Sequence, residues 1–170
     1  MVEAGAAVAA QLGRTLRAPS EVVATCHLGL PVVIAVPPIL DDGTPFPTRY
    51  WLTCPLAVRR VARLESAGEI ARFERRLTDD PEFAAGLAVA NHRYQVERDR
   101  LLSETAVHRP RGGVGGTSGG IKCLHAHAAD YLAGNENVLG EEVATMIGTL
   151  DCQVECVTDG NRNPAWREPR

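Results

Sequence analysis

One apolar run constrains the fold of this 170-residue chain more than any other segment. The run Pro31–Val36 is dominated by β-branched residues, and two further prolines end it. Such a run is typical of a buried strand. An Asp-Asp-Gly turn signal follows, and residues 49–53 form a second strand candidate. We therefore expect an antiparallel hairpin over about residues 31–53. One register places Ile34 opposite Tyr50, but the prolines at 37, 38, 45 and 47 disfavour a tight turn and leave the register open.

Helix signals fill most of the chain after this hairpin. Apolar residues at helical spacing occupy residues 56–77, with a break near Gly68, and residues 81–102 after an Asp-Pro start signal. Shorter helices are expected at residues 126–133 and from Glu141. The sequence therefore predicts an α+β fold, in which a small antiparallel sheet is covered by about four helices.

The chain has the length of one domain. A chain of this size buries roughly 70% of the surface that it exposes when unfolded, so folding requires neither a metal nor a disulfide. We expect a flexible or helical lead-in over residues 1–20, a single globular domain over residues 21–157 and a disordered tail over residues 158–170.

Charge and hydropathy exclude several classes of partner. The net charge is −3, which argues against bulk binding of nucleic acid. Arginines cluster between residues 59 and 76, but glutamates such as Glu65 are interleaved with them, a pattern typical of a solvated helix face. There is no secretory signal and no run long enough to span a membrane. We therefore expect a cytoplasmic protein with reduced cysteines.

The residues with the clearest chemistry are cysteines and histidines. Cys123, His125 and His127 lie in one short run, and Cys26 and Cys54 flank the predicted hairpin, whose open end would bring them together. Cysteine thiolates and histidine nitrogens bind zinc, and cysteine thiolates hold iron–sulfur clusters. These five residues are the predicted metal site. On a helix, Cys123 would align with His127 and not with His125.

Two other interpretations of the cysteines stay open. Cys123 has histidines nearby that can act as a base, and it precedes a predicted helix, so it can serve as a nucleophile. Alternatively, the thiols are buried core residues, which is common for free cysteines. Cys152 and Cys156 lie four residues apart, and we expect no function for them.

A glycine-rich loop offers a different kind of site. Backbone amides of such a loop, followed by a helix start, can bind phosphate. No strand precedes the loop and its lysine spacing differs from a Walker motif, so the alternative is a small phosphate-containing or nucleotide ligand held by a non-enzymatic module. The predicted residues are Gly115, Gly116, Gly119, Gly120 and Lys122.

Several motifs occur in a characteristic order. They are Cys26-x-x-Gly29-x-Pro31, Pro45-Phe46-Pro47-Thr48, Thr53-Cys54-Pro55, the segment 122–127 and Tyr131-Leu132-Ala133-Gly134. Over about residues 20–157 the chain resembles the bacterial family catalogued as domain of unknown function 501, and its alanine and arginine content is of actinobacterial type. The resemblance implies no catalytic residue. The neighbourhood of the family's genes implies a protein partner, as in a cell-division accessory with a structural thiol core.

Overall fold

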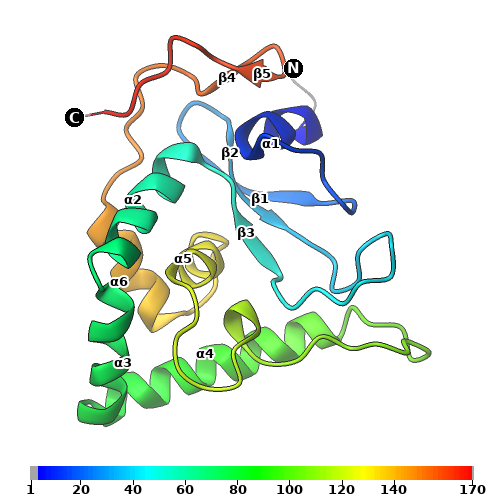
Figure 1. Cartoon of the computed structure of the whole chain (residues 1–170), viewed down its shortest axis with the longest axis vertical. Helices are drawn as coiled ribbons and strands as arrows, with labels where there is room; N and C mark the ends of the chain where they lie inside the picture. Colours follow the sequence, from blue (N-terminus) through cyan, green and yellow to red (C-terminus); the bar gives the residue numbers. More distant parts are fainter. Residues whose placement is uncertain (1–3, 170) are drawn as a thin grey trace.

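The hairpin expected at residues 31–53 is part of a three-stranded antiparallel sheet (Figure 1). This computed structural model describes residues 4–169, and within them the sheet is combined with six α-helices and a smaller two-stranded sheet. The predicted α+β class is therefore confirmed. The elements are, in chain order, α1 (Ala4–Leu12), β1 (Glu21–Thr25), β2 (Pro31–Ala35), β3 (Tyr50–Leu52), α2 (Pro55–Ser66), α3 (Glu69–Asp79), α4 (Pro81–Asp99), the 3-10 turn η1 (Val114–Gly116), α5 (Leu124–Leu132), α6 (Val138–Ile147), β4 (Val157–Thr158) and β5 (Asn161–Arg162).

β2 is the central strand of the larger sheet, and all of its residues are buried. Its outer neighbour β1 was not predicted from the sequence. The predicted register between β2 and β3 was wrong by one residue, because Ile34 lies opposite Trp51 and not Tyr50. Trp51 stacks on Phe46, with ring centroids 5.4 Å apart, and both rings pack with Ile34 in one apolar cluster. Packing therefore sets this register, since the connection between the strands is long and irregular.

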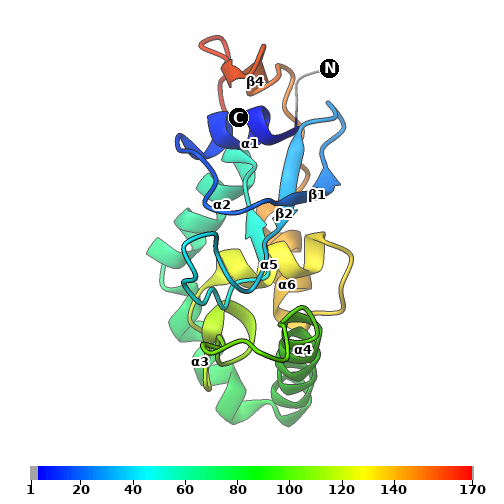
Figure 2. The same cartoon turned by 90° about the vertical axis from the view of Figure 1, so that its right-hand side faces the viewer.

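Different helices cover the two faces of the sheet (Figure 2). Neighbouring side chains of a strand point to opposite faces. Val33 packs in the main core with Leu124 of α5 and Val143 of α6, whereas Ile34 packs against Val8 of α1. The sheet therefore separates two apolar clusters, and α5 lies centrally against β3 and α6.

Local signals place the starts of α2 and α4 and the break at Gly68 close to their predicted positions, whereas α5 and α6 begin two and three residues earlier than expected. Pro55 is the first residue of α2, where its missing N–H costs no hydrogen bond. Gly68 separates α2 from α3 with a φ of +89°, a conformation that favours glycine. Asp80 caps α4 because its carboxylate accepts the Phe83 N–H at 3.0 Å. The first two of these positions bound α2, which carries Glu65 of the candidate site.

The two ends of the described chain pack together. β4 and β5 form a hairpin that contacts α1, in a region where the sequence led us to expect a disordered tail. Arg162 donates hydrogen bonds to the carbonyls of Ala10 and Gln11, at 2.9 and 3.0 Å. These are carbonyls at the end of α1 that the helix itself leaves without partners. Among the described residues, no helix has the length and apolar character needed to cross a membrane.

Candidate functional site

Three side chains from two helices converge beside β3. Glu65 comes from the last turn of α2, Cys123 immediately precedes α5, and His125 lies in the first turn of α5. One donor atom from each lies within 4.8 Å of the other two. Within residues 4–169 this is the only group of three cysteine, histidine or acidic residues with that spacing. It is therefore the best-formed candidate for a metal or catalytic site.

Both ring nitrogens of His125 are held by α2. Nδ1 lies 3.2 Å from the Glu65 carboxylate, and Nε2 lies 3.1 Å from the carbonyl oxygen of Val58. Val58 and Glu65 are seven residues apart, so they lie on one face of the helix. Burial lowers the pKa of His125, but hydrogen bonding to Cys123 and the charge of Glu65 outweigh it and raise that pKa to about 9. The ring orientation is therefore fixed on both sides.

Cys123 joins this histidine because it is not itself helical. Its backbone is extended, with φ −159° and ψ 121°. The helical alignment of Cys123 with His127 therefore does not apply, and His125 takes the place beside the thiol. Glu65 also accepts the backbone N–H of Leu124 at 2.7 Å, so this carboxylate caps the start of α5 from another helix.

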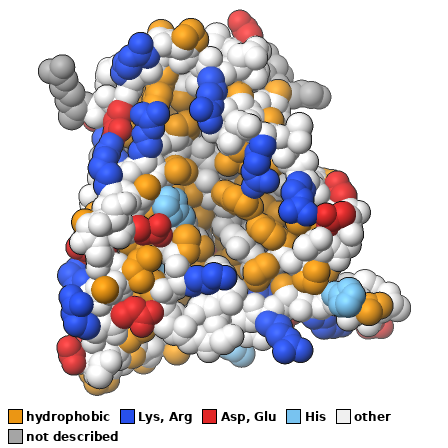
Figure 3. Space-filling model, in the orientation of Figure 1, with side chains coloured by type: hydrophobic (Ala, Val, Ile, Leu, Met, Phe, Trp, Pro, Cys, Tyr) orange, Lys and Arg blue, Asp and Glu red, His pale blue; other side chains and the backbone are white. Residues whose placement is uncertain are grey.

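The site opens into a cavity of about 450 Å³ between β3, α2 and α5. Figure 3 shows this face of the molecule hollowed near its centre, with hydrophobic side chains around the hollow. Aromatic and aliphatic side chains form most of the wall, and Lys122 is the one lysine or arginine among its described lining residues. The lining residues are Leu12, Phe46, Thr48, Tyr50, Trp51, Leu52, Val58, Gly115, Lys122, Cys123, His125 and Ala126.

The other residues of the predicted metal site lie elsewhere. His127 is fully buried, and its Nδ1 is 3.3 Å from the side-chain oxygen of Asn137. Burial lowers the pKa of His127 to about 4, with Asn137 opposing that shift. Cys26 and Cys54 flank the first residues of β2 and are not among the residues that line the cavity at Cys123. The structure thus unites Cys123 with His125 and places the remaining three in other surroundings.

Several backbone amides of the glycine-rich loop already donate hydrogen bonds within the protein. Gly119 N–H donates to the Thr117 hydroxyl at 3.2 Å, and the Ile121 N–H donates to the Glu74 carboxylate. The amides of Gly113, Val114 and Gly116 likewise have acceptors within the loop or on Asn91. Gly120 lies against the same Glu74 carboxylate. The Glu74 carboxylate therefore occupies the place where a phosphate would need free backbone amides. Two of the predicted loop residues, Gly115 and Lys122, instead line the 450 Å³ cavity.

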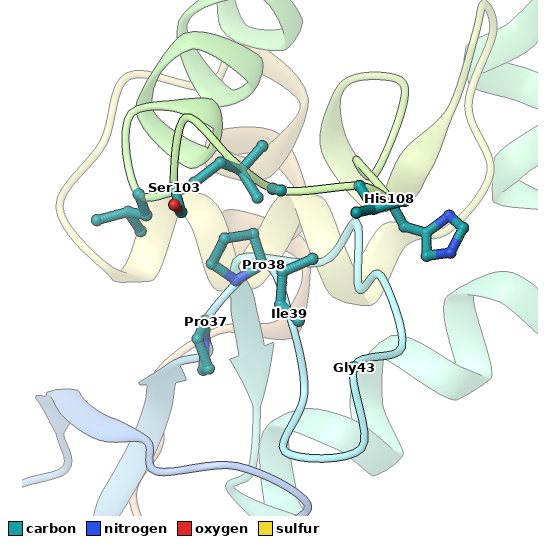
Figure 4. Close-up of a pocket in the computed structure, with 10 residues that line it drawn as sticks. Pro37, Pro38, Ile39, Gly43, Ser103 and His108 are labelled. Carbon is teal, nitrogen blue, oxygen red and sulfur yellow. The ribbon is translucent and has the colours of Figure 1, made fainter.

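A second cavity, of about 470 Å³, lacks comparable chemistry (Figure 4). It lies between the loop after β2 and the segment after α4, and its labelled wall includes Pro37, Pro38, Ile39 and Ser103. His108 is its only titratable lining residue, and the imidazole extends away from the two prolines in Figure 4. The cavity at Cys123 and His125 is therefore the better candidate for a functional site, although it is slightly smaller.

Glu65 is the member of the site that sequence reasoning missed. It belongs to the charged helical segment that was interpreted as a solvated face, yet it is only 26% exposed and faces His125. No local pattern distinguishes it from neighbouring glutamates. Only the tertiary packing of α2 on α5 brings it to Cys123 and His125.

The chain has one informative match among known proteins. The family model described as protein of unknown function (DUF501) matches residues 22–145. No curated protein and no solved structure matches the chain. The matched range contains Glu65, Cys123 and His125.

Proposed function

The chain belongs to the DUF501 family of proteins of unknown function, and we propose that it binds a divalent metal ion, most simply zinc, through Glu65, Cys123 and His125. The observation that carries this proposal is the convergence of three ligand types on one point at the wall of a cavity. Thiolate, imidazole and carboxylate are the side chains that zinc uses in proteins.

The hydrogen bonds of His125 fit a metal ligand. A histidine that ligates through one nitrogen commonly donates its other N–H to a carbonyl or carboxylate, and Nε2 faces the carbonyl of Val58 at 3.1 Å. In that tautomer Nδ1 is an acceptor that faces a second acceptor, Glu65, at 3.2 Å. A bound cation satisfies both atoms. An iron–sulfur cluster fits this location poorly, since Cys123 is its only thiol.

Three protein ligands leave a coordination position for water or substrate, and zinc bound in this way activates water and polarises carbonyl groups. The cavity supplies space for a small molecule beside that position. Its aromatic wall favours a substrate with an apolar part, and Lys122 supplies a positive charge for an anionic group. These features support an open, reactive site, and the reaction itself has to be found by experiment.

The test is metal analysis of the chain purified without a histidine tag. We expect His125→Ala and Cys123→Ser each to lose one bound zinc relative to the wild type. His108→Ala is the matched control, because His108 is exposed and lies in the other cavity. Unchanged zinc content in both site variants would contradict the proposal.

A second candidate is a thiol nucleophile at the same place. In the metal-free chain His125 has both ring nitrogens facing acceptors and a pKa of about 9, so a cationic imidazole lies beside Cys123 at neutral pH. Such a pairing activates cysteine nucleophiles. This alternative predicts that iodoacetamide labels Cys123 in the metal-free wild type faster than in His125→Ala. Equal rates would exclude it.

A further inference from the structure

The four cysteines outside the cavity gather around the first residues of β2. Cys26 N–H donates to the carbonyl of Leu30 at 2.9 Å, and Cys54 N–H approaches that of Val32 at 3.4 Å from the other side of the strand. Cys26 follows β1, and Cys54 immediately precedes α2. Both cysteines therefore belong to the same end of the sheet.

The other two cysteines reach this end from a segment that has no helix or strand. Residues 148–156 connect α6 to β4. Gln11 of α1 connects this segment to the start of β2. Its Nε2 donates to the carbonyl of Pro31 at 2.9 Å and to Cys156 Sγ at 3.5 Å. The carbonyl of Cys152 lies 2.9 Å from the ring of His27, the residue after Cys26. All four cysteines are therefore neighbours of the β2 start.

Two of the four sulfur atoms accept hydrogen bonds from N–H donors. The indole N–H of Trp166 donates to Cys152 Sγ at 3.4 Å, as the Gln11 amide does to Cys156. N–H donors of this kind stabilise metal-bound thiolates from outside the coordination shell. Cys54 and Cys152 are at most 9% exposed. All five cysteines of the chain are free thiols in this structure.

The main core brings three of these cysteines together. Cys54 and Cys152 belong to one cluster of buried residues, and Cys26 packs against that cluster. No three of these four sulfur atoms lie within 4.8 Å of one another in the structure. Binding of an ion therefore requires the cysteine side chains to rotate toward a common centre.

We propose that Cys26, Cys54, Cys152 and Cys156 form a second metal site, in which four thiolates enclose a structural zinc ion. Each thiol releases its proton to solvent as the sulfur binds the ion, and no redox step is involved. Four protein ligands leave no open position, which is the arrangement of structural zinc sites. The ion would join the end of β1, the start of α2 and the segment after α6, which are far apart in the sequence.

Cobalt substitution separates this site from the one in the cavity. Cobalt in a tetrahedral four-thiolate site has intense visible bands and strong sulfur-to-metal charge transfer. We expect these bands in the wild type and in Cys123→Ser. The double variant Cys152→Ser/Cys156→Ser should lose them together with one metal per chain. Persistence of the bands in the double variant, or their absence from the wild type, would overturn the proposal.

A measurement on the unaltered chain covers the case in which the double variant does not fold. The native protein is treated with iodoacetamide before and after removal of metal by a chelator, and the modified cysteines are located by mass spectrometry. We expect the four cysteines to be protected together and to react together after chelation. Protection that survives chelation, a disulfide between any two of them, or the visible spectrum of an iron–sulfur cluster would each overturn the zinc site.

Discussion

The two metal sites proposed for this chain differ in openness. Glu65, Cys123 and His125 mix three ligand types, and Cys123 and His125 line a cavity of about 450 Å³. The four-cysteine group around the start of β2 contains only thiols, and its members Cys54 and Cys152 are buried. Zinc sites with an open position serve chemistry, whereas closed sites of four ligands contribute to folding. The comparison therefore assigns reactivity to the first group and stability to the second.

The largest expected effect is the loss of stability in Cys54→Ser. This change removes a ligand from the four-cysteine group and places a hydroxyl in the core, where Cys54 is 5% exposed. We expect unfolding to become easier by at least about 4 kcal/mol in urea denaturation, a size associated with lost metal sites. Cys123→Ser should cost less than about 1 kcal/mol, because Cys123 is only half-buried, at the edge of a cavity. Equal losses would erase the distinction between the two groups.

The next effect concerns His127, the buried neighbour of the cavity histidine. Its pKa is about 4 when folded and about 6.5 when unfolded. The unfolded chain therefore binds more protons between these values, and stability falls as the pH is lowered from 6.5 to 4. The contribution amounts to at most about 3 kcal/mol. We expect His127→Gln to flatten this dependence, and His108→Ala to preserve it. A pH slope that is unchanged in His127→Gln would show that this histidine is not held neutral.

A smaller effect is expected on metal affinity at the cavity. His125→Ala should weaken zinc binding at this site by at least about 100-fold, since even outer-shell partners of metal ligands contribute 10–100-fold. Stability in the absence of added zinc should change little. The affinity is measured by competition with a chelator in the Cys152→Ser/Cys156→Ser background. An affinity equal to that of the same background with His125 intact would remove the histidine from the ligand set.

The smallest expected effect is on phosphate binding. The loop amides of Gly119 and Ile121 are already donated to protein acceptors. We therefore expect no saturable binding of ATP or polyphosphate in calorimetric titration, and no difference between wild type and Lys122→Ala. Saturable binding that Lys122→Ala abolishes would restore the phosphate-binding alternative and would place a third ligand site in the chain.

The sequence predicts the elements better than it predicts the site, and the reason is the range of the interactions. The β2 strand, the start of α2 at Pro55 and the break at Gly68 depend on local backbone chemistry, and all three were predicted. The register of β3 depends on how Trp51 packs, and it was wrong by one residue. Glu65 joins the site only through the packing of two helices that are distant in the sequence.

The cysteines show the same limit. The sequence grouped Cys26 and Cys54 with Cys123, because all three are close to conspicuous motifs. The structure brings Cys26 and Cys54 to the start of β2, where Cys152 and Cys156 are their neighbours. The sequence shows the four-residue spacing of Cys152 and Cys156. It does not show the path of residues 148–156, so the spacing alone did not predict that these cysteines lie near Cys26 and Cys54. Cys123 and His125, two residues apart in the sequence, were the part of the site that could be predicted.

X-ray absorption at the zinc edge tests the central claim, two sites with different ligands, most directly. In Cys123→Ser, the remaining zinc should show only sulfur neighbours at about 2.3 Å. In Cys152→Ser/Cys156→Ser, it should show mainly nitrogen and oxygen neighbours at about 2.0–2.2 Å with a single sulfur. The same mixed shell in both variants, or no bound zinc in a well-folded wild type, would contradict the account.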